Sequence, residues 1–106
     1  MKRLERYGEG LFCSEQLLEL EPNNHLFIAD HGFLLIHMNR YEEALRDYEL
    51  AVQLQPEEPT YYNNIGVCMN ALGRRDEAID AYKKAIELDP SYQKPKENLQ
   101  KIINGK

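Results

Sequence analysis

Residues 59–92 read PTYYNNIGVCMNALGRRDEAIDAYKKAIELDPSY, and the stretch before them, residues 25–58, reads HLFIADHGFLLIHMNRYEEALRDYELAVQLQPEE. Laid over each other without a gap, these two stretches of 34 residues share eight identities. The shared residues are small, aromatic, charged, leucine or proline: Gly32/Gly66, Arg40/Arg74, Glu43/Glu77, Ala44/Ala78, Tyr48/Tyr82, Ala51/Ala85, Leu54/Leu88 and Pro56/Pro90. Such a match without a gap indicates an internal repeat.

Each unit of the repeat predicts two helices. In the first half, apolar residues recur every three or four positions over 27–38 and again over 61–72, which is the period of an amphipathic helix. Asn39 and Gly73 then occupy equivalent positions, and both residue types tolerate the left-handed conformation that ends a helix. The second half has the same period and ends at the repeated proline.

The small residues of the repeat suggest how its two helices pack. Gly32 and Gly66 are expected to let the helices of one unit approach closely, with Ala44 and Ala78 facing them.

The flanking segments match parts of the same unit. Residues 2–21 match a second helix alone, and we expect one helix there, ending before Pro22. Residues 94–104 match the next first helix, with Leu99, Ile102 and Ile103 expected on one face. The other face is polar, as in the capping helix that ends a stack of repeats. The expected single domain comprises a half-repeat helix (1–24), two repeats (25–58 and 59–92) and a C-terminal capping helix (93–106).

With these residues the chain resembles the tetratricopeptide repeat family. The family's pattern stands here as Tyr62, Ile65-Gly66, Met69, Ala78, Tyr82 and Pro90, and in the preceding unit as Ile28, His31-Gly32, Leu35, Ala44, Tyr48 and Pro56. His31 departs from the usual aliphatic residue. The resemblance implies an all-α fold, an α-α superhelix (a tetratricopeptide solenoid) of six antiparallel helices, in which the first helices of the units line a concave groove.

Composition limits the class of partner. The 106 residues suffice for one domain, and 18 acidic against 13 basic residues give a net charge of −5. This balance argues against nucleic acid or an anionic membrane surface as a partner. The charged N-terminal stretch has no apolar core of a signal peptide, and Cys13 and Cys68 do not form a metal or disulfide pattern. We expect a cytoplasmic protein.

Candidate catalytic residues do not converge. His25, His31 and His37 are six residues apart, which places them on different sides of a helix, so that no shared metal is expected. His31 is expected to be a buried, hydrogen-bonded histidine. The acidic pairs lie at expected helix starts, where they suit the helix dipole. We therefore expect no enzyme, no catalytic residue, no metal and no cofactor.

The resemblance instead implies a non-catalytic protein–protein interaction module that binds an extended peptide or partner segment in the groove. The expected groove comprises an apolar patch, a row of amides and a basic end: Leu26, Ala29, Asp30, Phe33, Ile36, His37, Thr60, Asn63, Asn64, Val67, Asn70, Lys94, Asn98 and Lys101. Amides can hold the backbone of a peptide without reading its sequence, and lysines attract an acidic residue or a terminal carboxylate.

Some members of the family clamp the C-terminal tails of heat-shock chaperones. Of the five clamp positions, Asn64 and Lys94 match here, whereas Ala29, Phe33 and Asn98 do not. From this count we expect that the groove does not bind such tails.

Two alternatives remain open. The first helix carries Leu4, Leu11, Phe12 and Leu18, which suggests a self-associating scaffold in which this uncapped edge pairs with another copy, or a longer repeat array that continues there. The groove could instead serve as a chaperone for an apolar segment of a secreted partner, which Phe33 and Ile36 motivate.

Overall fold

The structure is a computed structural model that describes residues 2–105, with side chains from Arg6 onward. Over these residues the chain forms six helices and no strand. The helices are α1 (Lys2–Leu20), α2 (His25–His37), α3 (Tyr41–Leu54), α4 (Pro59–Ala71), α5 (Arg75–Leu88) and α6 (Gln93–Gly105). The prediction of an all-α fold is confirmed.

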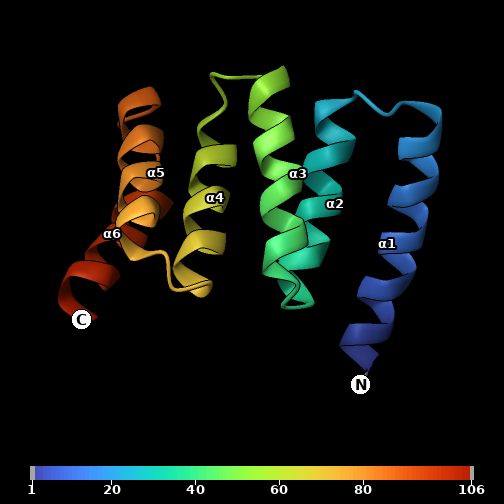
Figure 1. The fold of residues 1–106 in the computed structure, drawn as a ribbon, viewed down its shortest axis with the longest axis horizontal. Coiled ribbons are helices and arrows are strands. Elements are labelled where there is room, and N and C mark those ends of the chain that lie inside the picture. Colours follow the sequence, from blue (N-terminus) through green and yellow to red (C-terminus); the bar gives the residue numbers. More distant parts are fainter. Residues whose placement is uncertain (1, 106) are drawn as a thin grey trace.

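The helices stand in a row, each antiparallel to the one before it (Figure 1). Contacts join mainly neighbours in sequence, as expected for a stack of repeats. Among the described helices, α1 packs only on α2, and α6 packs on α5 with a smaller contact to α4. These two helices therefore form the opposite ends of the stack. Over the described residues, none of the helices combines the length and the apolar character needed to cross a bilayer.

Side chains from the loops cap the N-termini of α2 and α4, the first helices of the two units. The Asn24 side chain accepts hydrogen bonds from the amides of Leu26 and Phe27, at 3.0 and 3.3 Å. The Glu58 side chain accepts one from the amide of Thr60, at 3.4 Å. Each bond satisfies an amide that has no partner within its own helix. The polar residues before each unit thus act as N-caps.

The ends of α2 and α4 are built alike. Asn39 and Gly73 adopt positive φ angles of 61° and 82°. The amide of the arginine that follows each of them donates to a carbonyl in the last turn, at 2.9 and 2.8 Å. These bonds satisfy carbonyls that the helix leaves open. The predicted left-handed turn is present at both positions.

An ion pair repeated on the surface explains two of the identities between the units. The Arg40 guanidinium donates to both Glu43 oxygens, at 2.7 and 2.9 Å. Arg74 donates to Glu77 in the same way, at 2.7 and 3.0 Å. Both pairs are exposed, so they add little to stability, although each arginine lowers the pKa of its glutamate.

The glycines of the repeat lie beneath tyrosine rings. A Cβ atom on Gly32 would lie 2.8 Å from the Tyr48 ring, and one on Gly66 would lie 2.5 Å from the Tyr82 ring. The expectation that Ala44 and Ala78 face these glycines is wrong, because the flat tyrosine rings occupy that space. Glycine is therefore needed at both places for close packing rather than for backbone freedom.

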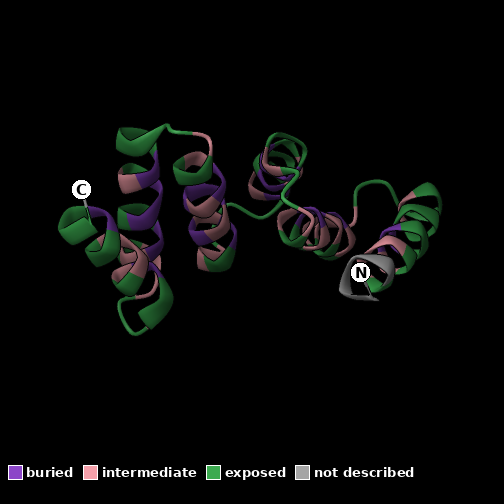
Figure 2. Cartoon of the chain, turned by 90° about the horizontal axis from the view of Figure 1, so that it is seen from below, coloured by how far each residue is buried: buried purple, intermediate pink, exposed green. Residues whose placement is uncertain are grey.

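The buried residues lie mainly on the sides of the helices that face their neighbours (Figure 2). One cluster of buried residues reaches from α1 to α5, and a second joins α5 to α6 around Ala78, Tyr82 and Ile102. Cys68 of α4 is fully buried, and burial raises the pKa of its thiol to about 12. On α6, Ile102 and Leu99 face inward as expected, but Ile103 is 62% exposed, contrary to the expectation. A second helix that would cover Ile103 in a complete repeat is absent from the described residues.

Candidate binding groove

Two adjoining cavities run along the faces of α2, α4 and α6. The first has a volume of about 310 Å³ and lies between α2 and α4. The second has a volume of about 470 Å³ and extends from α2 across α4 to α6. Phe33, Thr60 and Asn64 line both cavities. The three first helices of the units therefore share one groove.

Most of the groove residues expected from the sequence line these cavities. Those at the first cavity or at both are Leu26, Ala29, Asp30, Phe33, Thr60 and Asn64. Those at the second cavity alone are Ile36, His37, Asn63, Val67, Lys94, Asn98 and Lys101. Asn70 does not line either cavity, because it lies near the end of α4 in a separate hollow with Gly73 and Arg75.

The structure adds residues that the sequence did not indicate. Tyr48, Glu58 and Tyr61 line the first cavity, and Tyr92 and Glu97 line the second. Tyr48 comes from a second helix, but its hydroxyl reaches α2 and donates to the carbonyl of Ala29 at 3.1 Å. Gly32, which lies beneath the Tyr48 ring, is the sequence feature from which this contact of Tyr48 with α2 could have been predicted. Tyr92 lies in the loop before α6, where the helical period gives no guidance.

The end of the groove nearest α1 is apolar. Leu26 and Phe33 are 60% and 51% exposed, although both are large apolar residues. His37 stacks on Tyr7 of α1, with ring centroids 5.1 Å apart, and meets the edge of Phe33 at 4.4 Å. Ile36 is less available than expected, because it is half-buried against the core. The exposed apolar surface of this end is therefore that of Leu26 and Phe33.

The amide row is only partly open to a ligand. Asn63 is buried, and its carbonyl oxygen accepts a hydrogen bond from the Asn98 amide at 3.1 Å. This bond ties α4 to α6, so Asn63 lines the second cavity as expected, but its carbonyl oxygen is already engaged. Asn64 is half-buried beside the Tyr48 hydroxyl. Burial raises the pKa of that hydroxyl far above its ordinary value, so it stays protonated as a donor.

The end of the groove at α6 carries charges of both signs. Lys94 and Lys101 are exposed along the second cavity, as expected from the sequence. Glu97 stands between them in the chain and lines the same cavity. The positive character that we expected at this end is therefore partly offset.

The three histidines have separate partners. His25 lies 2.7 Å from the Tyr61 hydroxyl, and His37 belongs to the aromatic contact described above. His31 contacts Asp47 of α3 at 2.5 Å and Glu15 of α1 at 3.3 Å. The hydrogen bond with Asp47 raises the pKa of His31. His31 is hydrogen-bonded as expected, although it is half-buried rather than buried. Within residues 6–105, no group of three or more acidic, histidine or cysteine side chains could hold a metal.

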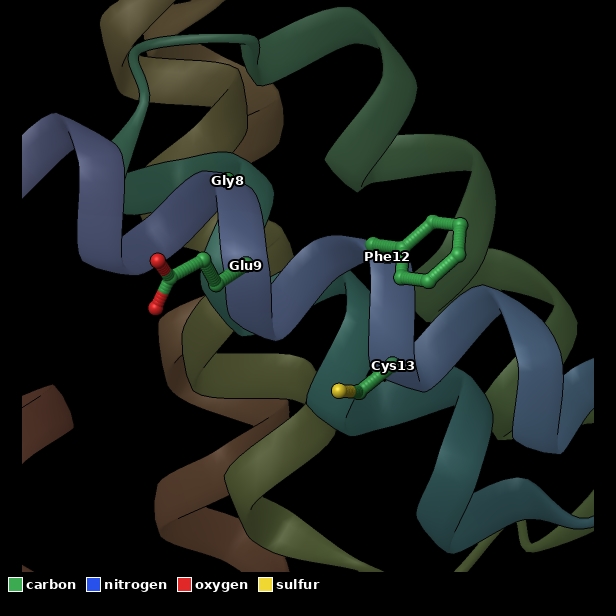
Figure 3. Close-up of a pocket in the computed structure, with 4 residues that line it drawn as sticks. All are labelled: Gly8, Glu9, Phe12 and Cys13. Atoms are coloured by element: carbon green, nitrogen blue, oxygen red, sulfur yellow. The ribbon is translucent and has the colours of Figure 1, made fainter.

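The expected oligomer edge on α1 is divided between two faces. Leu11 is buried in the core and Leu18 packs against it, so both were wrongly expected at the edge, because α2 covers that side of the helix. Phe12 is exposed and lines an outer hollow with Gly8, Glu9 and Cys13 (Figure 3). Leu17 and Leu20, which were not expected there, are exposed as well. Leu4 lies outside the residues whose side chains the structure describes.

Known structures match this fold over nearly the whole chain. The first tetratricopeptide domain of RPAP3, bound to the HSP90 peptide SRMEEVD, matches with a TM-score of 0.90 and 23% identity, over 97% of this chain and 82% of that one. MamA from Desulfovibrio magneticus matches with a TM-score of 0.89 and 24% identity, over 98% of this chain. The Sgt2 tetratricopeptide domain from Aspergillus fumigatus matches with a TM-score of 0.87 and 20% identity. The match covers 95% of this chain and 68% of that one. This chain spans only 59% of the MamA chain.

Family models identify the repeat directly. A search of curated proteins finds no match. Two models, both described as tetratricopeptide repeat, match residues 1–62 and 59–92. Together they extend from the first helix to the loop before the last one. The chain belongs to the tetratricopeptide repeat family.

Proposed function

We propose that this chain is a non-catalytic interaction module that binds an extended peptide along α2, α4 and α6. The observation that carries the proposal is the pair of cavities joined through Phe33, Thr60 and Asn64. A groove of this kind offers an apolar anchor site, a polar middle and lysines at one end. These are the features that an extended peptide uses when it binds a repeat surface.

The apolar end is the anchor site. Leu26 and Phe33 expose large apolar surfaces that core packing does not require. Burying a side chain of this size contributes about 1.5–3 kcal/mol. An apolar side chain of the peptide is therefore expected to lie between these two residues.

The middle of the groove holds the peptide backbone. Asn64 and Thr60 supply a donor and an acceptor each. Because these groups pair with any peptide amide, this part of the groove does not select a sequence. Selectivity is left to the two ends.

The end at α6 selects charge and thereby sets the direction of the peptide. Lys94 and Lys101 attract a carboxylate, either an acidic side chain or the C-terminus. We therefore expect the bound peptide to have its apolar anchor at α2 and its acidic end at α6.

The comparison with RPAP3 bears on the class of peptide. That domain is bound to the HSP90 peptide SRMEEVD, which is acidic toward its end. The expectation that heat-shock chaperone tails do not bind this groove is not borne out by the comparison, and SRMEEVD becomes a defined probe. The alternative of a chaperone for a secreted partner rested on Phe33 and Ile36, and the partial burial of Ile36 weakens it.

Selection from a displayed library of peptides with free C-termini tests the proposal. We expect enriched peptides with an apolar residue followed by an acidic end. In fluorescence anisotropy, Phe33→Glu with Asn64→Ala is expected to weaken their binding at least about tenfold, because the anchor site is lost. SRMEEVD is titrated in parallel.

The matched control is Leu50→Glu, which places the same charge on a partly exposed leucine of α3 that lines neither cavity. We expect this variant to bind the selected peptides as the wild type does. Equal binding by the groove variant and the control, or a library without enriched sequences, would overturn the proposal.

A further inference from the structure

We propose that the outer face of α1 receives α6 of a second copy of this chain, so that copies join head to tail. In each complete unit a first helix covers a second helix, as α2 covers α3 and α4 covers α5. By the 34-residue spacing, α1 is a second helix and α6 is a first helix. Within the described residues neither has its counterpart. The last helix of one copy and the first helix of the next would complete one unit.

The covered face of a second helix is known from α3. Asp47 and Tyr48 of α3 lie against Gly32 of α2, and Asp47 also contacts His31. The residues 34 positions earlier, on α1, are Cys13 and Ser14. The exposed side of α1 at Cys13 therefore corresponds to the side of α3 that α2 covers, whereas Ser14 is already buried within the chain.

This face of α1 is exposed and apolar. Cys13 is exposed. Leu17, one turn further along, is 43% exposed, whereas Ala51 at the equivalent position of α3 is fully buried. A Cβ atom on Gly8 would have no neighbour within 4 Å, so nothing among the described side chains covers this part of the helix. Figure 3 shows Phe12 and Cys13 on α1, with their side chains pointing in different directions.

The facing surface of α6 is exposed as well. Ile103 is 62% exposed, whereas Leu35, at the equivalent position of α2, is 1% exposed within the core. Gln100 is exposed and occupies the position of Gly32, which meets α3. Leu99, at the position of His31, is half-buried because it packs against the core. The exposed side of α6 is therefore the side that a second helix normally covers.

The two surfaces also match in polarity. In a complete unit, His31 of the first helix meets Asp47 of the second helix. By the 34-residue spacing, the half-buried Leu99 would meet the exposed Cys13 at this place. An apolar pair thus replaces a polar pair.

Charge favours this pairing over the pairing of two α6 helices. Over Lys2–Leu20, α1 carries four acidic residues and three basic ones, whereas over Gln93–Gly105, α6 carries three lysines and one glutamate. Two copies of α6 would bring like charges together. The α6 helix of a second copy is therefore the preferred occupant of the α1 face.

A head-to-tail contact has a consequence for the size of the assembly. The surfaces that meet are different, so each added copy leaves one free α1 face and one free α6 face. The assembly does not stop at a dimer, and its mass is expected to rise with concentration.

Two substitutions separate the surfaces. Leu17→Glu places a charge on the α1 face, and Ile103→Glu places one on the α6 face. Because Leu17 and Ile103 are exposed, both variants are expected to keep the fold. Circular dichroism checks that they do. In sedimentation velocity the wild type is expected to grow with concentration, while each variant alone stays a monomer. An equimolar mixture of the two variants is expected to give a particle of twice the chain mass and no larger one, because one intact surface remains on each.

Two further variants serve as controls. Leu50→Glu is expected to assemble as the wild type does, and Cys13→Glu is expected to reproduce Leu17→Glu. A wild type that remains monomeric at millimolar concentration would overturn the proposal. Self-association of Ile103→Glu alone would also overturn it, because it would show that α1 pairs with α1. Peptide binding in the groove is measured separately, so either proposal can fail without the other.

Discussion

At two places in the stack, a tyrosine ring lies where the methyl group of an alanine would have to fit. The tighter of the two is at Gly66, where an added Cβ would lie 2.5, 2.7 and 2.9 Å from three atoms of the Tyr82 ring. Tyr82 is itself buried, so its ring has no free space into which it can move. At these positions the preference of a helix for alanine over glycine, about 1 kcal/mol, is outweighed by packing.

Gly66→Ala is therefore expected to lower the free energy of unfolding by about 1–3 kcal/mol, because the Tyr82 ring is displaced. Urea denaturation followed by circular dichroism measures the change. The control is Gly8→Ala in α1, where a Cβ would have no neighbour within 4 Å. That variant is expected to gain up to about 1 kcal/mol. A stabilising effect at both positions would show that the ring has room to move.

At the scale of the helices, His31 joins three elements. From α2 it contacts Asp47 of α3 and Glu15 of α1. The contact with Glu15 is a polar link between α1 and α2, and it requires a protonated histidine to act as an ion pair. The contact with Asp47 raises the pKa of His31 above its ordinary value of 6.5.

Because the pKa of His31 is higher in the folded chain, its protonation stabilises the fold below pH 6.5, and this contribution is lost as the pH rises through the raised value. Thermal unfolding of the wild type and of His31→Gln from about pH 5 to about pH 9 measures this. The advantage of the wild type is expected to be largest at the acidic end and to shrink toward the alkaline end. A constant difference between the two proteins would contradict this role.

The helices were predictable because their signals are local. Asn39 and Gly73 end helices at equivalent positions, and their positive φ angles follow from the tolerance of those two residue types. The groove was predictable in outline for the same reason, since equivalent positions of α2, α4 and α6 face one way. The family resemblance implied that this shared face is the concave side of the stack.

The details of the site depend on contacts between distant residues, which a periodic pattern does not contain. Asn63 is closed off by Asn98, 35 residues away, and Tyr48 enters the groove from a second helix. On α1 the apolar residues occur on two sides, so the pattern alone did not show that α2 covers Leu11 and leaves Leu17 exposed. One helix with two apolar faces is ambiguous until its neighbour is known.

At the scale of the whole molecule, the row of helices predicts unequal protection. A stack of repeats is stabilised by contacts between neighbours, and α1 has one neighbour whereas α4 contacts α2, α3, α5 and α6. The central helices are therefore expected to open last.

Amide hydrogen exchange followed by mass spectrometry measures this order. We expect α1 to exchange first and α4 and α5 to exchange last, because opening α1 breaks only its contact with α2. The measurement is made on a dilute sample, in which copies are separated. Equal protection of α1 and α4 under these conditions would show that the stack opens as one unit.

The two cysteines differ in a way that has a practical consequence. Cys68 is fully buried and its thiol has a pKa of about 12, whereas Cys13 is exposed on the outer face of α1. Thiolate is the reactive form, so alkylation of the native protein is directed to a single site. A fluorophore can be attached there without substituting either cysteine, at the surface where a second copy is proposed to dock.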